Sequence, residues 1–220
     1  MKKVVKLTDA VSRIPDGAVL MIGGFMGAGT PPGLIDELVR QGKRELTVIG
    51  NDTARPGVGI GKLIAARMVR RVITSHIGTN PETQRQMIAG ETEVELVPQG
   101  TLAERIRAAG FGLGGVLTPT GVGTVVADGK RTIEIDGRSF LLELPLKADF
   151  ALINAWRADY LGNLEFALTS RNFNPLMAMA AAAVIAEAEN IVPVGVIPPD
   201  SVGVPNVLVD HLVGKERSHG

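Results

Sequence analysis

Two amide side chains, Asn51 and Gln99, each follow a short apolar run that has the pattern of a buried strand. The carboxyl ends of neighbouring parallel strands meet at one edge of an α/β sheet, so we expect the two amides to share a crevice. Uncharged amides in a crevice suit the polarisation of an acyl carbonyl or the stabilisation of an oxyanion. Taken singly, each amide is more commonly explained by a turn or a helix cap.

The glycine-rich segment GGFMGAGTPPG joins an apolar run at 18–22 to a stretch with helical spacing at 34–39. Backbone N–H groups in such a segment can approach an anion or a thioester, and the start of a helix favours negative charge. A tight turn that merely needs positive φ explains the glycines equally well. Thr30 is the expected cap of the helix that follows.

The other reactive side chains single out no catalytic group. His76 follows an apolar strand-like run, where a polar strand end is the ordinary explanation, and the three histidines lack the spacing of a metal site. Glu82 has the position of a helix-capping residue. The chain contains no cysteine, which excludes a thiolate nucleophile and a Cys-ligated metal.

Charge and length exclude several classes of protein. The 220 residues contain 23 Lys and Arg against 23 Asp and Glu, so no net charge attracts the chain to nucleic acid or to an anionic membrane. No apolar run approaches the roughly 20 residues that a membrane span needs. The start lacks the apolar region of a signal peptide, so we expect a cytoplasmic protein that binds neither nucleic acid nor membrane.

Apolar strand-like runs alternate with helical stretches through the first half of the chain. Expected strands lie at 18–22, 46–49, 71–77 and 94–97, and expected helices lie between them, one of them at 60–69. Thr79 with Glu82, and Thr101 with Glu104, have the spacing of capping boxes that open two further helices. This alternation predicts an α/β fold with an open, mostly parallel sheet and flanking helices.

The second half departs from that alternation. Residues at about 111–148 lose the helical period and contain two Asp-Gly turn signals, which predicts a β-rich insertion in a single domain that spans 1–220. A buried strand is expected at 150–153. A helix with a small-residue face is expected at 174–189, and a final strand at 207–209.

Six blocks, in order along the chain, resemble the motifs of family I CoA-transferases: DGAVLMIGGFMGAGTP, GNDT, SHIGTNPET, ELVPQGTLAERIRAAG, LTPTGVGT and SRNFNPLMAMAA. The resemblance covers nearly the whole chain and is nearest to alpha subunits of the acetate or butyrate:acetoacetate type. The 3-oxoadipate and succinyl:3-oxoacid enzymes are similar relatives and stay open as alternatives. The resemblance also implies the fold that this family shares with sugar-phosphate isomerases.

The resemblance implies that the chain is half of an active site. It implies that a homologous beta subunit carries the glutamate nucleophile, that coenzyme A enters as a thioester substrate, and that no metal or tightly bound cofactor takes part. The expected assembly is α2β2 or larger. Asn51 and Gln99 match positions that face the acyl group, with Gly100 on the same side. The matching loop beside them is Gly23, Gly24 and Phe25, and two residues of less clear role are His76 and Glu82.

Two other classes share the implied fold, because fold alone does not decide function. A sugar-phosphate isomerase should carry its own acid and base, and a ligand sensor should be attached to a DNA-binding helix-turn-helix. Neither feature is evident in the sequence. A scaffold or binding subunit is a third alternative.

Overall fold

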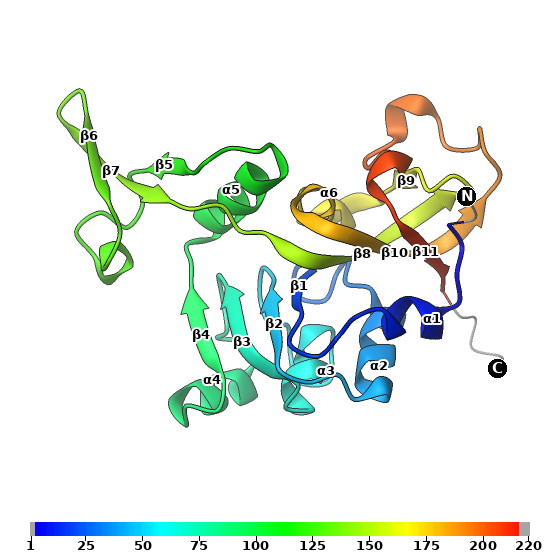
Figure 1. The fold of residues 1–220 in the computed structure, drawn as a ribbon, viewed down its shortest axis with the longest axis horizontal. Coiled ribbons are helices and arrows are strands. Elements are labelled where there is room, and N and C mark those ends of the chain that lie inside the picture. The colour runs from blue at the N-terminus through cyan, green and yellow to red at the C-terminus, as the bar shows by residue number, and fades with distance from the viewer. Residues whose placement is uncertain (1–2, 216–220) are drawn as a thin grey trace.

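The computed structural model describes residues 3–215, which fold around an eight-stranded sheet (Figure 1). Its order is β11-β10-β8-β1-β2-β3-β4, in which all neighbours pair in parallel, and β9 pairs antiparallel with β8. The strands are β1 Val19–Ile22, β2 Leu46–Ile49, β3 Val69–Thr74, β4 Glu93–Leu96, β8 Ala148–Asp159, β9 Leu164–Glu165, β10 Ala181–Val192 and β11 His211–Gly214. The predicted open, mostly parallel α/β sheet is confirmed.

Two layers of helices cover the sheet. The helices are α1 Leu7–Ser12, α2 Pro32–Gln41, α3 Ile60–Ala65, α4 Pro81–Ile88, α5 Gln99–Gly110 and α6 Asn174–Ala180. Successive residues of a strand face opposite sides of the sheet. Leu20 and Ile22 of β1 therefore pack in the core under α1, α2 and α3, whereas Met21 packs in the core under α5 and α6.

A second, three-stranded antiparallel sheet follows α5 and projects beyond the main sheet (Figure 1). It has the order β5-β7-β6 and consists of β5 Val116–Thr118, β6 Thr132–Ile135 and β7 Arg138–Glu143. Asp136 and Gly137 both have positive φ in the tight turn between β6 and β7, the conformation that favours an Asp-Gly pair. The side chain of Arg105 on α5 donates to the carbonyl oxygen of Leu144 at 2.8 Å, which ties this sheet to the main body.

The helix expected at 174–189 is wrong. Helix α6 ends at Ala180, and the following alanine-rich residues form β10, which lies between β8 and β11. An apolar run of this kind carries no period that separates a buried strand from a buried helix. The ladder to β8, from Ala181 paired with Ala148 to Val192 paired with Asp159, supplies the hydrogen bonds that decide for the strand.

Smaller differences concern the ends of elements. The strand expected at 207–209 is a 3-10 turn, η4 Asn206–Leu208, and the last strand comes later as β11. The other 3-10 turns are η1 Val125–Ala127, η2 Leu168–Arg171 and η3 Pro199–Ser201. The helix expected at 60–69 ends earlier, since α3 stops at Ala65. Val69 pairs with Leu46 as the first residue of β3.

Three expected helix caps are wrong in the same way. Asn80, not Thr79, caps α4 by accepting hydrogen bonds from the backbone N–H groups of Glu82 and Thr83. Helix α5 begins two residues before Thr101, and α2 follows Pro31, which offers no side-chain cap in place of Thr30. A capping side chain binds N–H groups within the first turn of its helix. A shift of the helix start by one or two residues therefore changes which residue has the cap position.

Candidate functional site

The amides of Asn51 and Gln99 meet at the carboxyl edge of the main sheet. In Figure 1, the arrowheads of β2, β3 and β4 point towards α5, whose first residue is Gln99. The Gln99 Nε2 atom donates to Asn51 Oδ1 at 2.6 Å. Asn51 is 3% exposed, whereas Gln99 lies at the surface, so the pair links a buried amide to an exposed one.

Asp52 fixes the orientation of this pair, although the sequence analysis did not single it out. Its Oδ2 atom accepts from Asn51 Nδ2 at 2.7 Å and from the backbone N–H of Met26 at 2.9 Å. Its Oδ1 atom accepts from the backbone N–H of Ala54 at 2.7 Å. Asp52 is therefore a buried positioning residue, and its place beside Asn51 in the sequence is the one signal that pointed to it.

The two amides keep hydrogen-bonding capacity for a ligand. A primary amide has two N–H donors, and one donor of Gln99 and one of Asn51 are used within the pair and its link to Asp52. The Ser75 hydroxyl donates to the Asn51 backbone oxygen at 2.7 Å, which further limits movement of the asparagine. The arrangement is a preorganised set of neutral donors, the kind that stabilises developing negative charge.

The glycine-rich loop after β1 is a tight turn. Phe25 and Ala28 exchange backbone hydrogen bonds of 3.0 and 2.9 Å, and Met26 and Gly27 between them have positive φ. The N–H of Gly24 donates to Asn172 Oδ1 at 3.1 Å, so this group is engaged within the chain and is not free for an anion. The loop thus forms a wall beside the Asp52 link, with the Phe25 ring 47% exposed.

Asn174, the first residue of α6, holds this loop in place. Its Nδ2 atom donates to the carbonyl oxygen of Gly29 at 2.9 Å, and its Oδ1 atom accepts from the N–H of Asn154 at 3.1 Å. A Cβ atom on Gly23 would lie 1.8 Å from that same Oδ1 atom, so glycine is required there. Phe173 has the N-cap position of α6, and Asn174 is the first residue of the helix.

Three other residues that the sequence suggested for the site are His76, Gly100 and Glu82. His76 is exposed and its backbone pairs with Asp52, which puts it one residue away from Asn51 across the sheet edge. Gly100 follows Gln99 on the exposed start of α5. The hydrogen bonds that the structure gives the Glu82 carboxylate come from Arg85 and Gln86 on its own helix. The hydrogen bonds from Arg85 and then Gln86 lower the pKa of Glu82 to about 2, so this carboxylate stays ionised at neutral pH.

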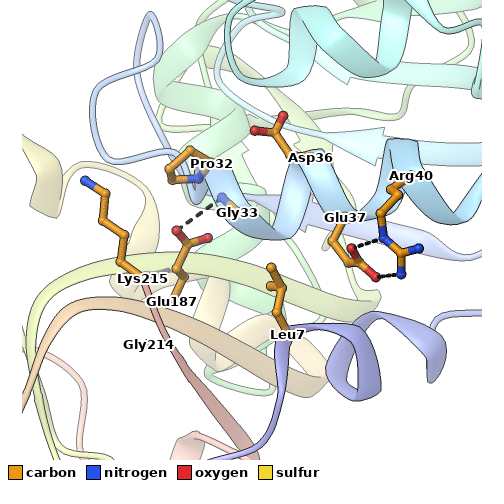
Figure 2. Close-up of a pocket in the computed structure, with 9 residues that line it drawn as sticks. All are labelled: Leu7, Pro32, Gly33, Asp36, Glu37, Arg40, Glu187, Gly214 and Lys215. Atoms are coloured by element: carbon orange, nitrogen blue, oxygen red, sulfur yellow. Dashed lines mark hydrogen bonds and ion pairs between the residues drawn. The ribbon is translucent and has the colours of Figure 1, made fainter. Parts of the chain in front are cut away.

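A separate hollow of about 400 Å³ contains another buried carboxylate (Figure 2). Glu187 accepts from the backbone N–H groups of Gly33 at 3.1 Å and of Leu34 at 2.9 Å, and so caps α2 in place of a local side chain. Burial raises the pKa of Glu187, and the two backbone donors oppose that rise. Because Glu187 occupies the start of α2, that helix end is not available to an anionic ligand.

Residues 3–215 contain neither a cluster of metal ligands nor a helix suited to span a membrane. No three His, Asp or Glu side chains in this range are grouped as a metal would require. No helix in this range is long and apolar enough to cross a membrane.

Comparisons with known proteins agree on one family. The family model described as "Coenzyme A transferase" matches residues 4–215. The chain is 54% identical to the acetate CoA-transferase subunit alpha of Escherichia coli, over 98% of each chain. It is 50% identical to the acetoacetyl-CoA:acetate/butyrate CoA transferase alpha subunit of Clostridium acetobutylicum, over 96% of this chain and 97% of the other.

A solved structure shares the fold. The acyl-CoA transferase YdiF of Escherichia coli O157:H7, as a thioester complex with CoA, superposes with a TM-score of 0.87 at 24% identity. The match covers 100% of this chain and 49% of that one, so the chain spans about half the length of YdiF. Subunits named for succinyl-CoA:3-ketoacid and for 3-oxoadipate transfer also match this chain.

Proposed function

The chain belongs to the coenzyme A transferase family, and from this premise we propose that it is the alpha subunit of an acetate or butyrate:acetoacetate CoA-transferase. The enzyme moves CoA between a short-chain acyl-CoA and a free carboxylate. The observation that carries this proposal is the amide pair, in which Gln99 is fixed 2.6 Å from Asn51 at the edge of the sheet. The similarity to two alpha subunits of this type along nearly their whole length supports it.

The chemistry proceeds through two covalent intermediates on the partner's glutamate. That carboxylate attacks the thioester carbonyl and gives a mixed acyl anhydride and CoA thiolate. The thiolate then attacks the glutamyl carbonyl, which releases the first carboxylic acid and leaves a glutamyl-CoA thioester. An incoming carboxylate then reacts by the same two steps in reverse and leaves as the new acyl-CoA. Because the first carboxylate leaves before the second one enters, the kinetics are ping-pong.

This chain supplies the surroundings of those steps. Each tetrahedral intermediate places negative charge on a former carbonyl oxygen, and the free N–H donors of Gln99 and Asn51 are positioned to stabilise it. Gly100 adds no side chain at the start of α5 beside Gln99, while Gly23, Gly24 and Phe25 begin the loop that Asp52 holds at Met26. We assign no step of the reaction to His76 or to Glu82 on α4.

We propose that the nucleophile comes from the partner subunit, which is supported by the engagement of the carboxylate next to the amide pair. Asp52 accepts hydrogen bonds on both oxygens and is 5% exposed, so it cannot approach an acyl carbonyl without releasing the loop that it holds. A homologous beta subunit with a glutamate facing Gln99 completes the site. We propose an α2β2 or larger assembly, a cytoplasmic location, coenzyme A as a substrate and no tightly bound cofactor.

Family membership separates this reading from the isomerase and sensor alternatives, because the matching relatives are named as CoA-transferase subunits. The succinyl:3-oxoacid and 3-oxoadipate enzymes are relatives within the same family and differ in the acyl group transferred. One methylene changes the binding free energy of an acyl group by only about 1–3 kcal/mol. The rates of CoA transfer to different carboxylates therefore identify the acyl pair.

Transfer of CoA from acetoacetyl-CoA to labelled acetate, which gives labelled acetyl-CoA and free acetoacetate, tests the proposal; formation of labelled acetyl-CoA is the exchange that is measured. We expect no exchange with this chain alone or with the beta subunit alone, and rapid exchange with parallel-line kinetics when the two are mixed. Exchange by this chain alone would contradict the shared site. If the mixture is silent with acetate and butyrate but transfers CoA to succinate or 3-oxoadipate, the acyl pair proposed here is wrong.

A further inference from the structure

The three-stranded sheet leaves and rejoins the main body at one narrow neck. Val116, the first residue of β5, pairs with Glu143, the last residue of β7, so the outgoing and returning chains lie side by side. A Cβ atom on Gly115 would lie 2.9 Å from the carbonyl oxygen of Glu143, so glycine is required for this close approach. The sheet is therefore joined to α5 and to β8 through two adjacent segments, 111–115 and 144–147.

This sheet has almost no core of its own. Within its three strands, only Leu141 and Glu143 are buried. A small sheet without a buried apolar face is not stable by itself and depends on packing against another element. Contacts with the main body must therefore fix its position.

Arg105 on α5 supplies such contacts at the neck. Its Nε atom donates to the carbonyl oxygen of Leu144 at 2.8 Å and lies 3.8 Å from a carboxylate oxygen of Glu143. Its backbone oxygen accepts from the N–H of Leu146 at 3.0 Å. Its Nη1 atom donates to Glu95 of β4 at 2.9 Å, so one guanidinium joins the neck to the main sheet. The Arg105 side chain is 11% exposed, so salt screens these contacts little.

Held in this way, the sheet faces the candidate site across a cavity of about 590 Å³. One side of the cavity is the start of α5, where the lining residues Pro98 and Gly100 flank Gln99. The other side is β5 and the turn after it, which present Val116, Leu117 and two threonines. The two apolar side chains offer water no hydrogen-bond partner. The sheet therefore limits the access of water to the space beside Gln99.

On the basis of the proposed function, we propose that the three-stranded sheet shields the covalent intermediate from water and that Arg105 is the positioning residue that holds this shield in place. In that function, the glutamyl-CoA thioester on the partner's glutamate lies next to Gln99. When water reaches the thioester, its oxygen bonds to the glutamyl carbonyl carbon, the C–S bond breaks, and a proton passes to the CoA thiolate. Each such event consumes one thioester without transfer, so exclusion of water favours transfer over hydrolysis.

Arg105→Met in the assembled enzyme tests the positioning residue. Methionine has no donor, but Glu95 keeps its ion pair with Arg71 at 2.7 Å. Glu143 keeps its ion pair with Lys130 at 2.6 Å, so the substitution leaves neither carboxylate without a partner. We expect the ratio of hydrolysis to transfer to rise about tenfold, because loss of a charge-assisted hydrogen bond lowers the population of the correctly placed sheet.

Both rates are measured from acetoacetyl-CoA. Hydrolysis is the release of free CoA thiol in the absence of an acceptor carboxylate, and transfer is the formation of acetyl-CoA after acetate is added. This chain contains no cysteine, so it adds no thiol of its own to the first assay. A variant that is merely less stable loses both rates in proportion and keeps the wild-type ratio, so the ratio separates positioning from stability.

Arg107→Met is the matched control. Arg107 lies on the same helix, its side chain is 50% exposed, and its ion pair is with Glu104 of that helix. We expect the wild-type ratio in this variant. An equal rise in the Arg105 and Arg107 variants would attribute the effect to α5 itself and overturn the role of Arg105.

Leu117→Ala tests the shield without touching the neck, and it decides the question even if the Arg105 variant fails to fold. Leu117 is 40% exposed and lines the cavity, so a smaller side chain admits water at little cost to the fold. We expect a ratio between those of the wild type and the Arg105 variant, because the sheet stays in place. Val125→Ala, at a residue that is 83% exposed and does not line the cavity, should keep the wild-type ratio.

The outcomes separate the shield from the proposed function. Wild-type ratios in both Arg105→Met and Leu117→Ala, in complexes that transfer CoA, would overturn the shield alone. Dissociation of a folded Arg105 variant from the beta subunit would assign the sheet to docking of that subunit and would overturn the shield too. A wild-type complex that transfers no CoA would overturn the proposed function, and with it the shield.

Discussion

Replacing Gln99 with alanine lowers turnover of the assembled enzyme about 10²-fold, the effect of losing one oxyanion donor. The Gln99 side chain is exposed at the start of α5, and its one hydrogen bond to a described residue is to Asn51 Oδ1. Its removal leaves the buried links from Asn51 to Asp52 and Ser75 in place. The loss therefore appears in kcat, measured at saturating acetoacetyl-CoA, with a stability change within about 0.5 kcal/mol.

Gln41→Ala is the matched control. Gln41 also ends in an amide that donates hydrogen bonds, to the carbonyl oxygen of Thr8 at 3.0 Å and to Glu37 at 2.7 Å, and it lies at the end of α2. We expect its turnover to stay within about twofold of the wild-type value. Wild-type turnover in the Gln99 variant, with its complex intact, would remove Gln99 from the site.

Replacing Gly23 with alanine destabilises the protein by about 3 kcal/mol, at the upper end of the range for overpacking. The new methyl group would lie 1.8 Å from Asn174 Oδ1, and Asn174 is fully buried. Asn174 cannot turn away without breaking its bonds to Gly29 and Asn154, so the loop must move instead. We also expect activity to fall, because Phe25 and the Met26 link to Asp52 move with that loop.

Urea unfolding at one protein concentration measures this change, because the stability of an oligomer depends on concentration. Gly114→Ala is the control, since a Cβ atom there meets nothing within 4 Å and the φ of Gly114 is not positive. It should be neutral or slightly stabilising. A Gly23 variant as stable as the Gly114 variant would show that the loop is not held by Asn174.

The sequence predicted those parts of the fold that depend on local pattern. Buried runs such as 18–22 and 46–49 are strands close to their expected positions, because four or five consecutive apolar residues suit a strand covered on both faces. The stretch after Asn174 shows where pattern fails. Seven residues form α6, and the alanines that continue it join the sheet, a choice made by pairing with β8 and not by propensity.

The candidate site was predictable in part for the same reason. Asn51 and Gln99 could be brought together from their places after two strands, since parallel strands end at one edge. The contacts that hold them could not. Asp52 binds Met26 from 26 residues away, and Asn174 binds Gly29 from 145 residues away. Glu187 caps α2 across a similar separation, and no local signal marks such partners.

In the proposed enzyme, this chain shapes the site while its partner subunit carries the covalent intermediate. Intact-mass measurement of both subunits, after the complex is mixed with acetoacetyl-CoA and quenched, tests it directly. We expect an adduct of CoA, attached with loss of water, on the beta subunit alone, and no change in the mass of this chain. A CoA adduct on this chain would contradict the assignment of the covalent intermediate to the partner subunit and would place the nucleophile among the carboxylates of this chain.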